Sequence, residues 1–549
     1  MQKFFTFLLI ILFGAGCSQQ NPPKEVDTII TGARIYTVDS AMHIYRAMAI
    51  LNGKIVDMGE NKRINNQYKA KVHYRFHGTL IYPGFIDAHC HFYGYGLARE
   101  RYANLTGTES YQQVLDRVTE YARAHPAQEW ILGRGWDQND WEVEDFPDNT
   151  KLNELFPDKP VLLIRIDGHA VLVNDKALEL AGFTARTKIA GGDLLKKGGR
   201  LTGVLLDNAA DSLKELVPAA GQQLIERALL RAQEDCFAVG LTGVVDAGLS
   251  NNLLHTIDQM QKEDRLKMRM DVMLNPSEQN FREFVDQGIY KTDYLIVNSV
   301  KLYADGALGS RGACLLEPYA DDIHNHGFLI HDPDYYDSIA HYLYDAGYQV
   351  NTHAIGDSAV RTVLKTYAKY LKGKNDRRWR IEHAQVVNPS DFHYFGDYSI
   401  IPAINTTHAT SDMYWAGERL GPERIKSAYA YHQLLEENGW LTNGSDFPVE
   451  SINPLFGFYA AVARKDQKGW PKDGFQAENK LSREEALKAM TIWAAKGSFV
   501  ERERGSLEVG KFADFVVLDR DIMEVPEDEI YKAQVKMTFV NGVPVFTNK

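Results

Sequence analysis

Eight short apolar segments, each ending in polar or ionisable residues, restrict the fold of this chain more than any other feature. They are residues 80–91, 241–246, 270–274, 299–305, 349–353, 379–383, 400–405 and 440–446. Between them lie stretches with helical spacing of apolar residues, for example 337–346 and 358–370. Strands that alternate with helices predict a parallel sheet, and eight such units predict a distorted TIM (β/α)8 barrel of the α/β class over residues 80–499.

Both ends of the chain are rich in strand-like segments. Residues 26–79 and 500–549 contain alternating apolar residues, and Asn52-Gly53 and Asn541-Gly542 are hairpin signals. We expect these two regions to form one small composite β-sandwich domain. The interval between the first and second barrel strands is too long for one helix, so it predicts a large insertion at about residues 97–235.

The first 17 residues have the pattern of a signal peptide. Lys3 precedes an apolar run at 4–13, and Gly14-Ala15-Gly16 stand before Cys17. The run is too short to span a bilayer. It resembles the lipobox of bacterial lipoproteins, apart from Gly14, and this resemblance implies lipidation of Cys17, a tether at residues 18–25 and a lipid anchor in the bacterial cell envelope. Ordinary secretion is the alternative.

Composition narrows the class of partner. A net charge of −12 argues against nucleic acid binding, which needs a basic surface. The other cysteines, Cys90, Cys236 and Cys314, are scattered and imply no disulfide framework. Composition therefore argues against a nucleic acid partner. Together with the candidate site described below, it leads us to expect an enzyme with a small-molecule substrate, and the sequence leaves open whether it forms a homodimer.

Ionisable residues stand where most of the predicted strands end. His89 and His91 are two residues apart on the first strand, so their imidazoles leave by the same face while Cys90 faces the other way. Later strands end in further candidates, namely Lys301, His353, His383 and Asp446. The carboxyl ends of barrel strands form the active site, and imidazole and carboxylate suit a divalent metal.

Several longer phrases resemble the amidohydrolase superfamily, and more narrowly its family 3 branch, which includes N-substituted formamide deformylases. They include Pro83-Gly84-Phe85-Ile86-Asp87-Ala88-His89-Cys90-His91, Gly135-Trp136-Asp137, Asp167-Gly168-His169, Arg380-Ile381-Glu382-His383 and Gly444-Ser445-Asp446. The resemblance implies one or two divalent ions, with zinc expected. The implied ligands are His89, His91, Lys301, His353, His383 and Asp446.

Lys301 is a problem for this ligand set, because an ammonium group has no lone pair to offer a cation. In many binuclear amidohydrolases the corresponding lysine reacts with carbon dioxide and its carbamate bridges two metals. The alternative is an ordinary cation that pairs with Asp305 or with the substrate, beside a single metal.

Other residues are candidates for substrate contact. By its position in the family pattern, His169 is expected to contact the substrate or an oxyanion, or else to pack in a loop. Further expected contacts are Trp136, Asp137, Asp305, Ser310 and Arg311. His324-Asn325-His326 is a second His-x-His, but it lies in a polar loop with no strand to align its side chains.

The resemblance implies hydrolysis of an amide-type C–N bond, as in N-formyl or N-acyl compounds, and the site residues suit a metal-activated hydroxide with Asp446 as proton shuttle. One alternative is a mononuclear deaminase on the same fold. It would need a glutamate shortly after His353, where the chain has Asp357. The other is a binding lipoprotein of the cell envelope without catalytic activity.

Overall fold

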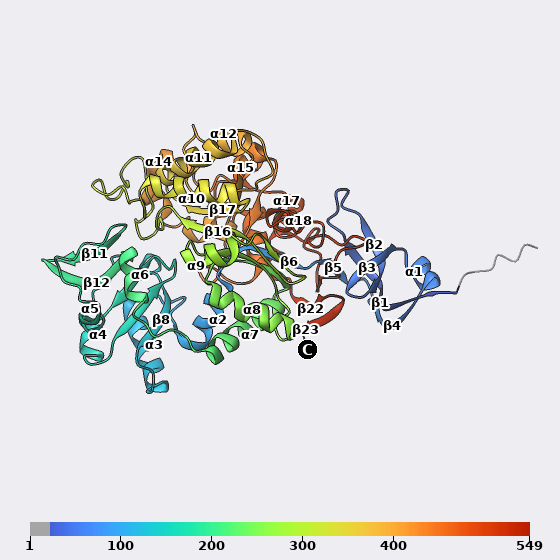
Figure 1. Cartoon of the computed structure of the whole chain (residues 1–549), viewed down its shortest axis with the longest axis horizontal. Coiled ribbons are helices and arrows are strands. Elements are labelled where there is room, and N and C mark those ends of the chain that lie inside the picture. Colours follow the sequence, from blue (N-terminus) through green and yellow to red (C-terminus); the bar gives the residue numbers. More distant parts are fainter. Residues whose placement is uncertain (1–21, 549) are drawn as a thin grey trace, which may run out of the picture.

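The computed structural model describes residues 22–548. The signal peptide, Cys17 and the first part of the tether lie outside the described residues. Within them, no helix is long and apolar enough to span a bilayer. Residues 22–548 form three sheets, of which the central one belongs to the barrel (Figure 1).

The central sheet confirms the predicted distorted barrel. Eight strands pair in parallel in the order β20-β19-β18-β17-β16-β14-β13-β6, and the short antiparallel β15 pairs with β16. β20 and β6, the two ends of this order, lie side by side, so the barrel is nearly closed. The strands are β6 (Phe85–Cys90), β13 (Leu241–Leu249), β14 (Arg269–Leu274), β15 (Tyr290–Lys291), β16 (Leu295–Tyr303), β17 (Gln349–Ala354), β18 (Arg380–His383), β19 (Ile401–Ile404) and β20 (Thr442–Asn443).

Helices surround this sheet and bury its outer face. Their apolar residues join those of the strands in one large core that includes Trp379, Tyr367 and Phe458. The helices are α2 (Phe92–Arg101), α7 (Gln222–Ala238), α8 (Asn251–Lys262), α9 (Glu278–Asn280), α10 (Pro333–Ala346), α11 (Asp357–Leu371), α12 (His393–Asp397), α13 (Thr406–Asp412), α14 (Ala416–Arg424), α15 (Tyr431–Asn438), α16 (Pro454–Ala463), α17 (Arg483–Ala489) and α18 (Ile492–Gly497).

A second sheet is formed by both ends of the chain. Its order is β23-β22-β21-β5-β1-β2-β3, with β4 on β1, and it curls so that the rings of Tyr74 and Phe539 meet at 5.3 Å between centroids. The elements are β1 (Lys24–Tyr36), β2 (Ile44–Leu51), β3 (Lys54–Gly59), α1 (Asn61–Gln67), β4 (Tyr68–Arg75), β5 (Leu80–Pro83), β21 (Phe515–Leu518), β22 (Val535–Val540) and β23 (Val543–Thr547).

The first predicted barrel strand divides between these two sheets. β5 pairs with β21 in the terminal sheet, and β6 begins the barrel two residues later. The change of sheet falls at Gly84, whose N–H donates to Asp514 O at 2.9 Å. A Cβ at Gly84 would lie 2.1 Å from Thr242 Oγ1, so this crossing requires glycine. Residues 80–83 therefore belong to the terminal sheet and not to the barrel.

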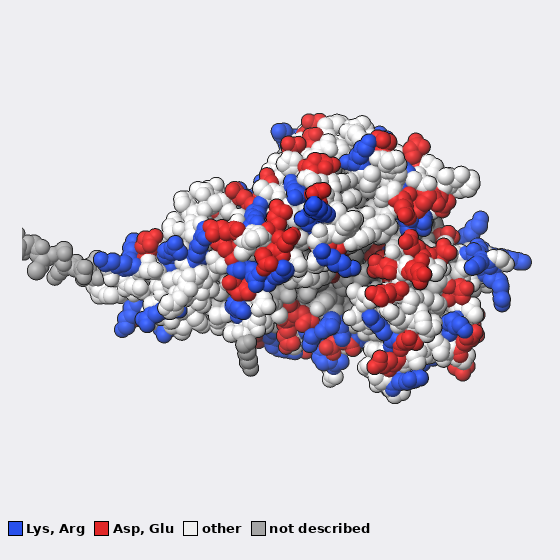
Figure 2. All heavy atoms as spheres, turned by 180° about the vertical axis from the view of Figure 1, so that it is seen from behind, with Lys and Arg blue, Asp and Glu red and all other residues white. Residues whose placement is uncertain are grey.

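The segment after α2 forms a third sheet, which caps one side of the barrel. Its order is β11-β12-β10-β9-β8-β7, and Figure 1 shows it at the end of the molecule opposite the terminal sheet. Seen from behind, basic and acidic side chains are interspersed over most of the surface (Figure 2). The elements are β7 (Ala103–Asn104), α3 (Tyr111–Ala124), β8 (Ile131–Trp136), α4 (Thr150–Leu155), β9 (Val161–Arg165), β10 (Ala170–Val173), α5 (Asp175–Ala181), β11 (Gly192–Lys197), β12 (Arg200–Asp207) and α6 (Asn208–Lys214).

Candidate active site

The six side chains predicted as metal ligands meet at the carboxyl ends of the barrel strands. His89, Lys301, His353 and His383 are on β6, β16, β17 and β18, and each is at most 4% exposed. His91 follows β6 directly, and Asp446 comes three residues after β20. Because the strands are parallel and adjacent, their ends share one rim, and residues far apart in sequence are brought together there.

Asp446 lies between the two histidines of the first strand. Its Oδ1 is 3.2 Å from His91 Nε2 and 3.6 Å from His89 Nε2. On the other side of His89, Lys301 Nζ lies 3.1 Å from Nε2. The His383 ring is 4.9 Å from the His89 ring and 4.6 Å from the His353 ring, between centroids. The six side chains thus form one cluster.

The chemistry of this cluster fits a divalent metal. His89, His383 and Asp446 each place a donor atom within 4.8 Å of the others. Asp446 Oδ1 is buried and accepts no hydrogen bond from any described residue. A buried carboxylate oxygen without a donor is costly unless a cation satisfies it. The geometry therefore leaves an acceptor that a bound metal would complete.

The charge states of these groups suit metal binding. Burial lowers the pKa of His89 to about 4 and that of His383 well below its usual value, so both imidazoles are neutral and keep a lone pair. Burial alone would raise the pKa of Asp446, but His91 and His89 hold it well below its usual range. Burial also lowers the pKa of Lys301 to about 8, which increases the fraction of neutral amine near neutral pH.

Hydrogen bonds at Nδ1 fix the orientation of the histidine rings in the cluster. His89 Nδ1 contacts Glu382 Oε2, and His383 Nδ1 bonds Asn405 Oδ1 at 2.8 Å. His91 Nδ1 donates to Ala247 O at 3.1 Å. With Nδ1 engaged, the Nε2 lone pair of each ring is available to the site. Glu382 is in turn held by Arg380, whose Nε is 2.7 Å from Glu382 Oε1.

The sequence Gly444-Ser445-Asp446 explains how Asp446 reaches the cluster. A Cβ at Gly444 would lie 2.3 Å from His89 N, so the backbone approaches only because this residue is glycine. Asp446 N then donates to His89 O at 2.7 Å. Ser445 Oγ donates to Asp87 Oδ2 at 2.6 Å. Two bonds thus tie the loop to β6, next to the histidines.

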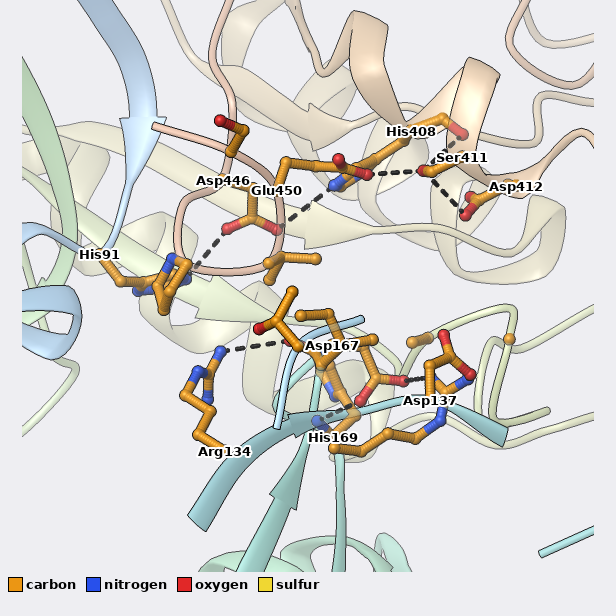
Figure 3. A pocket seen from close by; sticks show the side chains of 18 of the residues that line it. His91, Arg134, Asp137, Asp167, His169, His408, Ser411, Asp412, Asp446 and Glu450 are labelled. Atoms are coloured by element: carbon orange, nitrogen blue, oxygen red, sulfur yellow. Dashed lines mark hydrogen bonds and ion pairs between the residues drawn. The ribbon is translucent and has the colours of Figure 1, made fainter. Parts of the chain in front are cut away.

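A cavity of about 600 Å³ opens above the cluster, between the barrel and the third sheet. His169 lines it and bonds Asp207 Oδ1 through Nδ1 at 2.8 Å, and its ring lies 4.9 Å from that of His353. Asp137 also lines the cavity (Figure 3) and forms an ion pair with Arg165. The third sheet therefore supplies part of the cavity wall.

Four predicted substrate residues lie outside the cavity lining. Trp136 is fully buried and donates from Nε1 to Leu163 O at 2.9 Å. Asp305 accepts from the backbone N–H groups of Ile355, Gly356 and Cys314, and so shapes the loop after β17. Ser310 Oγ donates to Ala307 O, while Arg311 pairs with Asp321 at 2.8 Å. These four have structural contacts that satisfy their polar atoms.

The second His-x-His motif is also outside the cavity. His324 and His326 are exposed in a loop without a strand, and neither lines the cavity. This agrees with the expectation that no strand aligns their side chains.

Sequence reasoning missed His408, which lines the cavity on α13. Its Nε2 lies 3.9 Å from Asp446 Oδ2 and is buried without a hydrogen-bond partner among the described residues. Its ring stacks on that of His383, 5.8 Å between centroids. The only signal in the sequence was its place three residues after the end of the seventh strand segment, at Asn405.

Comparison with known proteins decides the family. Residues 77–546 match the model of the amidohydrolase family. The chain belongs to this family. It is therefore an enzyme of the amidohydrolase type, as the sequence predicted.

Two curated relatives span nearly the same length. The chain is 30% identical over 524 residues to a putative amidohydrolase of Bacillus subtilis, covering 94% of this chain and 98% of the relative. It is 27% identical over 545 residues to the N-substituted formamide deformylase of Arthrobacter pascens, with coverage of 94% and 98%.

A solved structure shares the fold of this amidohydrolase. An uncharacterised metal-dependent hydrolase from Pyrococcus horikoshii superposes with a TM-score of 0.74 at 25% identity, covering 91% of this chain and 99% of that one. The match includes the third sheet and the terminal sheet as well as the barrel, because so little of either chain is left out.

Proposed function

We propose that the protein is a metal-dependent hydrolase that cleaves an amide-type C–N bond, as in N-formyl or N-acyl compounds. The observation that carries this proposal is the buried cluster of His89, His353, His383 and Asp446, in which Asp446 Oδ1 has no hydrogen-bond donor among the described residues. The family membership and the similarity to a formamide deformylase support the bond type.

His89, His91, His353, His383 and Asp446 would hold the metal in this proposal. When bound, the metal would polarise a substrate carbonyl and lower the pKa of a water molecule. The chain's own residues then handle protons and orientation. Asp446 accepts the proton of the attacking water and passes it to the leaving nitrogen, because its carboxylate lies at the cavity floor among the metal-binding histidines.

His169 would contact the substrate carbonyl oxygen in this scheme. Its Nδ1 is engaged by Asp207, and its ring stands beside His353 at the cavity wall. Burial would lower the pKa of His169, but the Asp207 carboxylate raises it above its usual value. A protonated His169 can donate from Nε2 to an oxygen that gains negative charge.

Lys301 decides how many metals the site takes. Its buried amine is the form that reacts with carbon dioxide, and the resulting carbamate would supply two oxygens for a second metal. If the amine stays unmodified, we expect a single metal. Intact-protein mass spectrometry under native conditions distinguishes the two, because the carbamate adds the mass of one carbon dioxide and is lost in Lys301→Ala.

Deamination has less support. The alternative needs a glutamate shortly after the strand-five histidine. Asp357 stands there instead, begins α11 and accepts from Leu316 N at 2.9 Å, outside the cavity lining.

A hydrolysis screen tests the proposal. The zinc-reconstituted enzyme is offered N-formyl, N-acetyl, cyclic amide and ester substrates, with assays for the released acid and for ammonia. We expect amide hydrolysis that falls by at least about 1000-fold in Asp446→Asn, since both a ligand and the proton shuttle are altered. Asp140→Asn is the matched control, because Asp140 lines the same cavity without contacting the cluster. Ammonia release from an amidine, without amide hydrolysis, would favour the deaminase.

The lipid anchor remains a proposal from the sequence alone. If Cys17 is lipidated, a clickable palmitate analogue should label the protein in its bacterial host and should not label Cys17→Ala. A wild-type protein that is found in the medium and carries no label would favour ordinary secretion.

A further inference from the structure

Arg134 of the third sheet enters the active-site cavity because of a local irregularity in its strand. Arg134 and Trp136 are two residues apart on β8, and a regular strand would turn both to the same face. The pairing with β9 shifts between these two residues, and Gly135 between them has φ of +108°. As a result Trp136 enters the core, while Arg134 lines the cavity.

The Arg134 guanidinium has few partners in the protein. Its Nη2 donates to Ile166 O at 3.3 Å, a long bond, and no carboxylate of residues 22–548 lies within ion-pair distance. Its Nε is buried and donates to no described group. Burial lowers its pKa, in keeping with a cation that the protein compensates poorly. Arg134 is half-buried, and a charge that is partly removed from water is normally paired, so its guanidinium leaves room for a partner in the cavity.

The other arginines of the cavity show what satisfied partners look like. Arg165, on the neighbouring strand, is paired with both Asp137 and Asp167. Arg99 is exposed, and its Nε lies 3.4 Å from Asp235 Oδ2. Arg134 differs from both because, among the described residues, it has no ion-pair partner in either wall of the cavity.

The surroundings of Arg134 favour a singly charged anion. In Figure 3 its guanidinium points from the third sheet towards the space beside His91 and Asp446. Asp167 and Asp446 are the acidic groups that act on it electrostatically, but Asp167 is paired with Arg165 and Asp446 belongs to the metal cluster. Their negative charge would oppose a dianion. A carboxylate carries one charge and matches the fork of N–H donors on arginine.

We propose that Arg134 binds a carboxylate of the substrate, so that the enzyme prefers amides that carry a free carboxylate. This inference rests on the proposed amide hydrolysis and specifies its substrate. Arg134 is then a specificity-determining residue, while the metal cluster acts on the amide bond.

Binding of uncleavable analogues tests this inference without any turnover. The probes are N-(methylsulfonyl)glycine and 3-(methylsulfonyl)propanoate, which place the carboxylate on either side of the position of the scissile bond. Each is compared with its neutral carboxamide by calorimetry on the metal-loaded enzyme. We expect at least one carboxylate to bind roughly 10- to 100-fold more tightly than its carboxamide, the range for a hydrogen-bonded charge.

Variants assign the preference to Arg134. In Arg134→Gln the carboxylate and the carboxamide should bind with nearly equal affinity, and Arg134→Lys should keep part of the preference. Arg99→Gln is the matched control, since Arg99 lines the same cavity but has its own carboxylate partner, and it should leave the preference unchanged. Melting curves check that each variant is folded.

Three results would overturn the inference. They are equal affinity of acid and carboxamide in both wild-type pairs, no binding of any probe, or a preference that survives in Arg134→Gln, which would mean that the metal or another group binds the carboxylate. The hydrolysis screen is independent of these results. If the enzyme hydrolyses only neutral amides, the proposed function stands and the role of Arg134 is wrong; if it hydrolyses no amide but binds the acids through Arg134, the reverse holds.

Discussion

Replacing Glu382 by Gln tests whether the buried support beneath His89 controls metal binding. Glu382 and Arg380 are both fully buried, and Glu382 also contacts His89 Nδ1. Arg380 and His89 lower the pKa of Glu382 to about 2 against the effect of burial, so it is a carboxylate at neutral pH. The variant therefore removes one charge from a buried ion pair and weakens the acceptor that orients His89.

Two effects of different size should follow. Leaving Arg380 without its anion should lower the free energy of unfolding by about 3–5 kcal/mol, the usual cost of breaking a buried pair. Loss of the carboxylate that orients His89 should weaken metal binding by roughly 10- to 100-fold. Denaturant unfolding of the metal-free protein measures the first effect, and competition with a chelator of known affinity measures the second.

Asp514→Asn separates these two effects. Asp514 and Arg269 form another buried ion pair, which joins the terminal sheet to the barrel far from the metal cluster. This variant should lose comparable stability and keep the metal affinity of the wild type. If Glu382→Gln binds metal as tightly as Asp514→Asn does, the reasoning about His89 is refuted.

Three further predictions concern the surroundings of the cluster. Gly444→Ala places a Cβ 2.3 Å from His89 N, so we expect less bound metal per chain by elemental analysis, whereas Gly417→Ala, in open space, should bind normally. Burial raises the pKa of Glu450 to about 7 from 4.5, so the folded state keeps its proton longer than the unfolded state and this group costs stability as pH rises from about 4.5 to 7. Glu450→Gln should therefore have a higher melting temperature than the wild type at pH 8, with a free energy of unfolding larger by at most about 3 kcal/mol. The two proteins should not differ at pH 4.5, and equal melting temperatures at pH 8 would contradict this prediction. Asp207→Asn removes the carboxylate that bonds His169, so kcat should fall with little change in KM, and a change in KM alone would mean that His169 only binds substrate.

The sequence was sufficient for the barrel and for the six residues at its rim. Each strand is a short apolar segment that ends in a polar residue, and parallel strands carry those endings to one side. His89, His353 and His383 could be placed together by counting strands, without knowledge of any contact between them. The family resemblance, which the match over residues 77–546 confirms, rests on the same segments.

Local irregularities of the backbone explain why other features of the fold and of the cavity could not be predicted from the sequence. Residues 80–91 were interpreted as one strand because their apolar pattern is continuous, and only the contact of Gly84 with Thr242 shows the change of sheet. Trp136 was expected in the cavity because it lies in a phrase rich in glycine and charge. The irregularity at Gly135 turns it into the core and brings Arg134 to the cavity instead. His408 lies on a helix after the seventh strand, so the pattern of polar residues at strand ends could not identify it.

The most direct test of the central claim is amide hydrolysis measured against metal content. Protein freed of metal by a chelator is titrated with zinc while hydrolysis of the best substrate from the screen is followed. The account predicts that metal-free protein is inactive, that activity rises to a plateau at one or two zinc ions per chain, and that His383→Ala fails to reach it. Full hydrolysis by protein that retains no metal would contradict the account.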